Sequence, residues 1–406
     1  METSERARDR VRGRSRRQLH GFATAAGLWL LAAQLAFAAP FTPTSDDTVL
    51  EELPTASSAL ARNLAHERRA LNGSPRDRAR ATALAWRYIE AARSDGDPRY
   101  IGLAEGLLTP WLASDPPPTD VLLLRATLRQ NRHDFSGAER DLDALLAREP
   151  RNAQAWLTRA VVAKVRGNLA AARQSCVPLL RLADALTATT CLADAASLLG
   201  QSAASMRALD RAIRANSGVP ASQRQWAIVT LAEIRERAGD APGAEASYQA
   251  ALELARDSYT LAAYADFLLD AKRPRDVLAL LGGDRRVDGL LLRRALAEQQ
   301  LRAPGLVASV RELRARFAAS RLRGENLHAG EEARFALAFG DVHAALALAR
   351  NNFALQREPR DARVLLECAL AAREREAARP ALAVLAETKL EDVRLRELAA
   401  RVEALQ

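Results

Sequence analysis

The sequence predicts an all-α protein built as a solenoid of stacked antiparallel helix pairs, and three observations support this. Hydrophobic residues make up 49% of the chain but aromatic residues only 5%, so the interior is filled mainly by Ala and Leu, which favour helices. The chain has 406 residues, whereas a single compact core usually stops growing at about 250 to 300. Small residues also recur at the spacing of a helix pair, which favours a repeat array over several separate domains.

Alanines mark the repeat: Ala126, Ala160, Ala193, Ala232 and Ala265 follow one another at intervals of 34, 33, 39 and 33 residues. We expect small side chains where the two helices of a pair cross closely, because nothing larger fits there. The interval of 39 contains the turn-forming run 216–221, which predicts a longer loop between repeats with both neighbouring helices unchanged.

Residues 153–184 carry the clearest motif. An aromatic residue, a small residue, a turn glycine and a second-helix alanine stand at Trp156, Ala160, Gly167 and Ala172. This pattern resembles the tetratricopeptide repeat, and its offsets recur from Leu122, Thr189 and Ile228. The chain resembles a group of exported bacterial tetratricopeptide-like proteins, which implies a right-handed superhelix whose first helices line a concave groove.

The domain organisation follows from this pattern. We expect N-terminal helical hairpins over 56–118, the clearest repeats over 119–285, and degenerate repeats with a C-terminal capping helix over 286–406. At about 34 residues per repeat, this gives nine or ten helix pairs. First helices should end at Gly167, Gly200, Gly239 and Gly340, where glycine most easily adopts a left-handed conformation.

Residues 1–38 have the form of a secretory signal peptide. Seven arginines stand against three acidic residues and precede an uncharged apolar stretch over 21–39. We expect cleavage after Ala38, a disordered linker over 39–55, and a periplasmic or secreted mature protein. Arg16 and Arg17 leave the twin-arginine route open beside general secretion. An uncleaved helix that anchors the protein in the inner membrane is the alternative, because about 19 apolar residues just span a bilayer.

The net charge of +9 and the pI of about 10.1 suggest nucleic acid at first. Residues 1–38 supply +4 of this charge, and the other arginines are interspersed with Asp and Glu. Such a pattern is typical of solvated, salt-bridged helix surfaces. We therefore expect neither nucleic-acid binding nor membrane insertion once the signal is removed.

No catalytic motif is found in the sequence. The motifs of phosphate-binding loops, dinucleotide sites, serine hydrolases and zinc proteases are absent. No two histidines after the signal have metal-ligand spacing with a third ligand nearby. Glu331 and Glu332 are interpreted as first-turn acids of a helix, favoured by its positive end. We expect no catalytic residues, no cofactor and no metal.

Cys176 and Cys191 fall in the second helix of one predicted pair and the first helix of the next, which pack side by side in the tetratricopeptide fold. An oxidising periplasm permits a disulfide there, and two buried thiols are the alternative. Cys368 stays unpaired in either case.

The partner is predicted to be another protein or a peptide. If the tetratricopeptide pattern carries over, the residues that face the groove are Leu123, Thr127, Leu157, Val161, Val229 and Glu233. Several of these are apolar, which argues against a carboxylate clamp and for a hydrophobic contact. A second candidate surface, for an anionic group, is formed by Arg311, Arg314, Arg321 and Arg323, although Glu312 and Glu325 are available to pair with these arginines.

The function predicted from these features is a non-enzymatic interaction scaffold or assembly factor in the bacterial envelope. One alternative is a transferase or hydrolase with an unrecognised site near residues 317–335. The other is a structural spacer without a specific ligand.

Overall fold

The computed structural model describes Ser45 and residues 59–95, 97, 99–114, 116–283, 285–322 and 329–405. The predicted signal peptide over 1–38, its cleavage site and nearly all of the linker over 39–55 lie outside these residues and stay predictions. Residues 58–406 form one compact unit.

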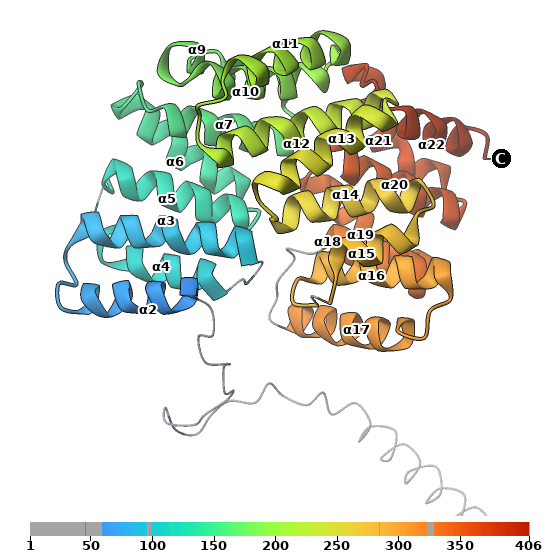
Figure 1. Cartoon of the computed structure of the whole chain (residues 1–406), viewed down its shortest axis with the longest axis horizontal. Helices are drawn as coiled ribbons and strands as arrows, with labels where there is room; N and C mark the ends of the chain where they lie inside the picture. Colours follow the sequence, from blue (N-terminus) through green and yellow to red (C-terminus); the bar gives the residue numbers. More distant parts are fainter. Residues whose placement is uncertain are drawn as a thin grey trace, which may run out of the picture. The chain divides into compact units, whose positions relative to one another are not determined.

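This unit is an all-α solenoid, as predicted, and the described residues contain no strand (Figure 1). In the part of the chain that the structure describes, nine helix pairs follow α2 (Ala59–Asn72), and α22 (Val393–Glu403) caps the last of them; α9 (Leu179–Leu182) is a short insertion. The pairs are α3 (Arg78–Asp95) with α4 (Arg99–Leu112), α5 (Thr119–Asn131) with α6 (Phe135–Arg148), α7 (Ala153–Val165) with α8 (Leu169–Cys176), α10 (Ala185–Ser197) with α11 (Ser202–Ala215), α12 (Ala221–Ala238) with α13 (Ala241–Leu254), α14 (Ser258–Asp270) with α15 (Pro274–Leu281), α16 (Asp288–Leu301) with α17 (Leu306–Leu322), α18 (Ala329–Phe339) with α19 (Val342–Leu355), and α20 (Pro359–Ala372) with α21 (Arg375–Thr388).

The recurring small residues occupy equivalent places in successive pairs. Each of the five alanines lies in a first helix and is at most 4% exposed. The small residues at the matching second-helix position are buried to the same degree; they are Ala138, Ala172, Ser205 and Ala244. The repeat frame and the tetratricopeptide-like fold are therefore confirmed in this chain.

The prediction for the interval of 39 residues is wrong in one respect. The loop between α11 and α12 spans only 216–220, and α12 begins eleven residues before Ala232, whereas α7 begins seven residues before Ala160. The surplus is therefore mostly one added turn of helix. Residues 221–225 are Ala, Ser, Gln, Arg and Gln, and nothing after Pro220 stops them from joining the helix.

Turn glycines end three first helices as expected, with φ of 79° at Gly167, 73° at Gly200 and 86° at Gly239. Gly340 also follows the end of a first helix, α18, but its φ is not positive, so the predicted left-handed conformation is wrong at this position. In the pair α5–α6, His133 takes the glycine's place with φ of 60°.

The C-terminal pairs pack against the turns of the central pairs. The backbone N–H of Arg357 donates to the carbonyl oxygen of Val165 at 2.7 Å, and the N–H of Ser202 donates to the carboxylate of Glu391 at 3.0 Å. A β-carbon on Gly200 would lie 2.8 Å from the carbonyl oxygen of Lys389. Helix α22 also lies beside α12, and Arg363 of α20 donates to Asp270 at the end of α14, although these helices are far apart in the sequence (Figure 1).

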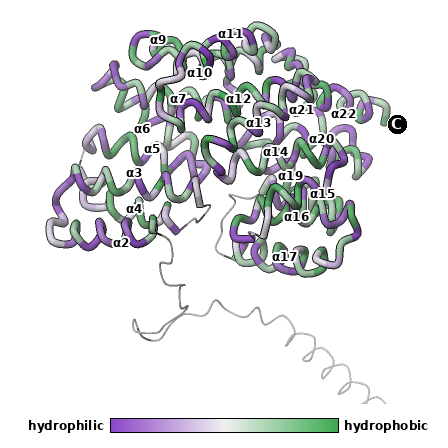
Figure 2. The backbone as a smooth tube through the Cα atoms, viewed as in Figure 1, coloured by the Kyte–Doolittle hydropathy of each residue, from purple (hydrophilic) through white to green (hydrophobic). Residues whose placement is uncertain are grey.

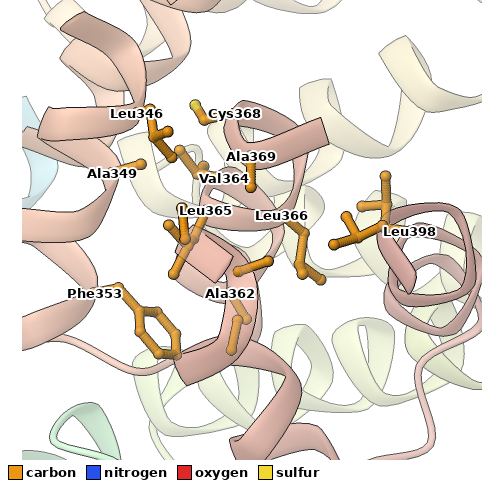
Figure 3. Packing of buried hydrophobic residues seen from close by; sticks show 14 of the residues in the cluster. Leu346, Ala349, Phe353, Ala362, Val364, Leu365, Leu366, Cys368, Ala369 and Leu398 are labelled. Carbon is orange, nitrogen blue, oxygen red and sulfur yellow. The ribbon is translucent and has the colours of Figure 1, made fainter. Parts of the chain in front are cut away.

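Hydrophobic and hydrophilic residues alternate along the helices (Figure 2), and the apolar faces form a chain of connected cores. The C-terminal core contains Leu346, Val364, Leu365 and Leu398 together with Cys368, which is fully buried (Figure 3). Among the described helices, none is both long and apolar enough to cross a bilayer.

Candidate functional site

First helices from both halves of the solenoid surround a cavity of about 470 Å³. Most lining residues come from α7, α10, α12, α14 and α16 and from α18, α20 and α22 or the turns before them, and Tyr248 of α13 and Asn352 of α19 also contribute. Eight carboxylates contribute, from Asp194, Glu233, Glu236, Asp266, Glu331, Glu358, Asp361 and Asp392. Seven cationic side chains accompany them, from Lys164, Arg237, Arg293, Arg334, Arg360, Arg363 and Arg394.

Lys164 of α7 forms ion pairs with α10 and with the residue before α20, and so links the central pairs to the C-terminal pairs. Its ammonium lies 2.8 Å from the carboxylate of Asp194 and 3.6 Å from that of Glu358. Burial alone would lower the pKa of Lys164, but the two carboxylates raise it above its usual value. Burial opposes ionisation of Glu358 as well, yet Arg360 at 2.6 Å and Lys164 lower its pKa to about 2. Both groups are therefore held charged.

A second cluster centres on Asp266 of α14. Arg293 of α16 lies 2.6 Å from its carboxylate and Arg334 of α18 lies 2.9 Å away. Arg293 also pairs with Glu331 at 2.9 Å. Burial opposes the charge on Asp266, but the two guanidinium groups outweigh it and hold its pKa well below the usual range. This cluster ties three successive pairs together.

A third cluster fixes the C-terminal pairs to α12 and α14. Arg363 of α20 makes two hydrogen bonds of 2.7 Å to the carboxylate of Asp270. Arg394 of α22 pairs with Asp270 at 3.0 Å and also with Glu236. Tyr248 donates its hydroxyl proton to Glu236 at 2.5 Å. Burial is the main cause that raises the pKa of Glu236, against the effect of Arg394.

Glu233 and Arg237 differ from these clusters, because neither has an ion-pair partner within 4 Å among the described residues. Glu233 instead accepts a hydrogen bond of 2.5 Å from the hydroxyl of Tyr259. Arg237 donates to the hydroxyl of Ser197 at 3.0 Å, and its buried Nε has no hydrogen-bond partner. Burial raises the pKa of Glu233 even though Arg237 lies near enough to oppose the shift.

The cavity can be reached by solvent. The guanidinium of Arg360 lies 5.8 Å from the ring centre of Tyr259, a cation–π arrangement. The Arg360 side chain is 61% exposed and Tyr259 is 48% exposed. A ligand therefore has access to this part of the lining.

Three of the six residues predicted to face a groove are buried in helix packing instead. Leu123 is 8% exposed, Thr127 2% and Val229 5%, and the hydroxyl of Thr127 donates to the carbonyl oxygen of Leu123. The prediction assumed an open concave face, whereas neighbouring helices cover these positions.

The other three predicted groove residues keep some exposure. Leu157 and Val161 are partly buried in the cores beside α7. Glu233 lines the cavity. It is the only one of the six that lies in the cavity lining.

The arginines predicted as an anionic contact do not form one cluster. Arg311 and Arg314 are exposed on α17, and Arg321 pairs with Glu332. Arg323 lies outside the described residues. Glu312, expected to pair with the first two, pairs instead with Arg285 and Arg316.

Cys176 and Cys191 form a disulfide in the structure, with their Cα atoms 5.6 Å apart. The third thiol, Cys368, is free and buried. Burial raises its pKa to about 12.

The cavity reaches the segment suggested for an enzyme site, through Gly330, Glu331 and Arg334. Glu331 stands in the first turn of α18, as predicted, and is also ion-paired. Ser258 lines the cavity too, but its hydroxyl donates to the carbonyl oxygen of Arg93 at 3.0 Å rather than to a base. The described residues contain no group of three or more metal-ligating side chains.

Most of the charged lining was not predicted, because its members and their ion-pair partners are far apart in the sequence. Arg363 and Asp270 are separated by 93 residues, and Arg394 and Glu236 by 158. One signal was available: Lys164 is one of only three lysines in the chain and stands on a first helix. A charge on the inner helix of a repeat indicates a polar interior.

Comparisons with known proteins gave structural likeness only. No family model matches the chain, and no curated protein matches it. The fold is similar to that of the APC/C hetero-tetramer Cut9-Hcn1, at 12% identity and a TM-score of 0.39, over 84% of this chain and 52% of that one. It is also similar to a tetratricopeptide repeat protein from Parabacteroides merdae, at 13% identity and a TM-score of 0.32, over 80% of this chain and 97% of that one. A monomeric mutant of IFIT1 with m7Gppp-AAAA is similar at 15% identity and a TM-score of 0.38, over 86% and 87%.

Proposed function

We propose that this chain is a non-enzymatic interaction scaffold or assembly factor of the bacterial envelope, which holds a segment of a partner protein in its central cavity. One observation carries the proposal: first helices from both halves of the solenoid direct charged side chains into a single solvent-reached cavity of about 470 Å³. Cavities of this size suit a short segment or a small ligand rather than a folded domain.

The ion pairs of the lining support a binding role for the cavity. Buried or half-buried charges are costly unless paired. The ion pairs around Lys164, Asp266 and Asp270 hold the helices around the cavity in place, so that the other lining side chains have fixed positions. A rigid lining lowers the entropic cost of binding a partner segment. Tyr259 and Arg360 are the most exposed side chains of the described lining.

Affinity purification of the tagged full chain from its source cells, with mass spectrometry, tests this function. Ala263 lines the cavity, so Ala263→Trp should fill part of it and remove a stoichiometric partner. Ala308→Trp, on the exposed face of α17, adds the same bulk elsewhere and should retain the partner. A partner that survives Ala263→Trp, or the lack of any stoichiometric partner, contradicts the proposal.

The envelope location is part of the proposal and is supported by the signal-like residues 1–38. Cell fractionation followed by N-terminal sequencing tests it. We expect a mature chain that begins at Ala39 in the periplasmic fraction. Recovery of the uncut chain from the cytoplasm contradicts the location, whereas recovery of the uncut chain from the inner membrane supports the anchored alternative.

A further inference from the structure

Glu233 and Arg237 stand one turn apart on α12 and both line the cavity. A glutamate four residues before an arginine is the favourable arrangement for an ion pair along a helix. Their charged nitrogen and oxygen atoms nevertheless lie more than 4 Å apart. Their separation therefore requires an explanation.

Two hydroxyl groups from other helices hold these charges apart. Tyr259 of α14 donates to the carboxylate of Glu233 at 2.5 Å. Ser197 of α10 accepts from Nη2 of Arg237 at 3.0 Å. A neutral hydroxyl compensates a buried charge less than an opposite charge does, so both groups keep unused capacity for an ionic partner. The unpartnered Nε of Arg237 is consistent with this.

The rest of the cavity does not supply the missing partners. Lys164, the cation that faces Glu233 from α7, is shared between Asp194 and Glu358. Arg360, which faces Tyr259 from α20, is paired with Glu358. Glu233 and Arg237 therefore present one acceptor and one donor of opposite sign on the same wall.

From this geometry we infer a bipolar subsite for a ligand that carries a cationic group for Glu233 and a carboxylate for Arg237. Ammonium or guanidinium groups fit the first position, because a carboxylate and the exposed ring of Tyr259 both attract cations. The carboxylate fits the second position, because a guanidinium binds it through charge-assisted hydrogen bonds. This chemistry occurs in free basic amino acids and at the end of a peptide whose last residue is Arg or Lys. The inference rests on the proposed binding function of the cavity and specifies its ligand.

Calorimetric titration of the full chain with four probes tests the subsite. Acetyl-Ala-Ala-Arg with a free carboxylate has both charges, its C-terminal amide keeps only the cation, and acetyl-Ala-Ala-Gln with a free carboxylate keeps only the anion. Because each charge-assisted contact adds to the binding free energy, the first peptide should bind at least about tenfold more tightly than either of the others. Free L-arginine is the fourth probe: binding as tight as that of the first peptide assigns the site to the free amino acid, and weaker binding assigns it to a chain end. Equal affinities for the three peptides, or no binding by any probe, overturn the inference.

Variants of the chain show whether this wall is responsible. Glu233→Gln should reduce the affinity for the first peptide to that of the carboxylate-only peptide, and Arg237→Gln to that of the amide. Glu253→Gln and Arg207→Gln make the same changes at exposed sites outside the cavity and should leave the affinity unchanged. If Glu233→Gln binds the first peptide as the unaltered chain does, the inference is wrong.

Tyr259→Phe tests whether the Tyr259 hydroxyl positions Glu233 for a ligand or only stabilises the fold. Without the Tyr259 hydroxyl, Glu233 is free to pair with Arg237, so affinity should fall about tenfold although no charge has been removed. A melting temperature within a few degrees of that of the unaltered chain confirms that the variant folds. Unchanged affinity in a folded Tyr259→Phe protein overturns the inference. A partner that is lost with Ala263→Trp but kept with Glu233→Gln would refute the subsite and leave the binding function standing.

Discussion

The backbone N–H of Arg357 donates to the carbonyl oxygen of Val165, 2.7 Å away. This bond joins the loop before α20 to the end of α7, across almost half of the chain. A backbone bond at such a distance shows that the last pairs and the central pairs pack directly on each other. The last pairs therefore cover part of the inner side of the central pairs, and the charged cavity that lies between them is reached by solvent.

Removal of Lys164 tests the electrostatic part of this closure. Lys164→Met leaves Asp194 and Glu358 without their shared cation, so the free energy of unfolding should fall by about 3 kcal/mol, the low end of the cost of breaking a buried pair. Lys272→Met changes an exposed lysine and should have an effect within about 0.5 kcal/mol. Urea denaturation measures both; equal effects would contradict a structural role of Lys164.

Turn glycines provide a steric test. Gly200→Ala forces a left-handed conformation at φ of 73° and brings a β-carbon 2.8 Å from the carbonyl oxygen of Lys389, so it should destabilise the chain by about 2 kcal/mol or more. Gly239→Ala carries the same backbone cost, but its nearest neighbour is a side-chain carbon of Val393 at 3.3 Å. We expect the loss of stability at Gly200 to exceed that at Gly239. The reverse order in thermal denaturation would show that Lys389 does not pack there.

The disulfide predicts a thiol count. Denatured without reductant, the protein should titrate one thiol, that of Cys368, and with reductant it should titrate all three. Replacing Cys176 and Cys191 together by Ser should lower the free energy of unfolding by about 3 kcal/mol, as expected for a loop of 15 residues. Three thiols without reductant would refute the disulfide.

Asp361 predicts a pH dependence. Burial and the neighbouring Glu358 raise the pKa of Asp361 from 3.8 to about 6. Between these two values the folded chain binds more protons at this group than the unfolded chain, so this group's contribution to stability falls as pH rises from about 4 to 6. Asp361→Asn should remove this part of the slope, measured by urea denaturation at a series of pH values. An unchanged slope over that window would contradict the raised pKa.

Sequence periodicity predicted the helix pairs well, because each pair is a local unit with small residues at fixed offsets. The position of Ala160 against Ala172, for example, depends on residues within one repeat. The cavity could not be predicted in the same way, because Arg394 meets Glu236 only once the whole array has curved. That curvature is the sum of small rotations between pairs, which one repeat does not specify. The added turn at the start of α12 was also not predicted from the sequence.

The groove residues illustrate the same limit. Leu123 and Val229 stand at repeat positions that were predicted to face a groove, yet they are buried in this chain. Glu233 was named from its repeat position, but its separation from Arg237 depends on Tyr259 and Ser197, which come from neighbouring pairs. A single repeat does not contain that information.

Hydrogen exchange at the backbone amide of Arg357 tests the closed architecture most directly. This amide lies outside the helices, between α19 and α20, so in an open solenoid it would exchange at the rate of an unstructured loop. Since it donates to Val165 in the closed form, it should be protected to a degree comparable with amides inside α20. Exchange of the Arg357 amide at the unprotected rate, while α20 stays protected, would contradict the closure of the solenoid around its cavity.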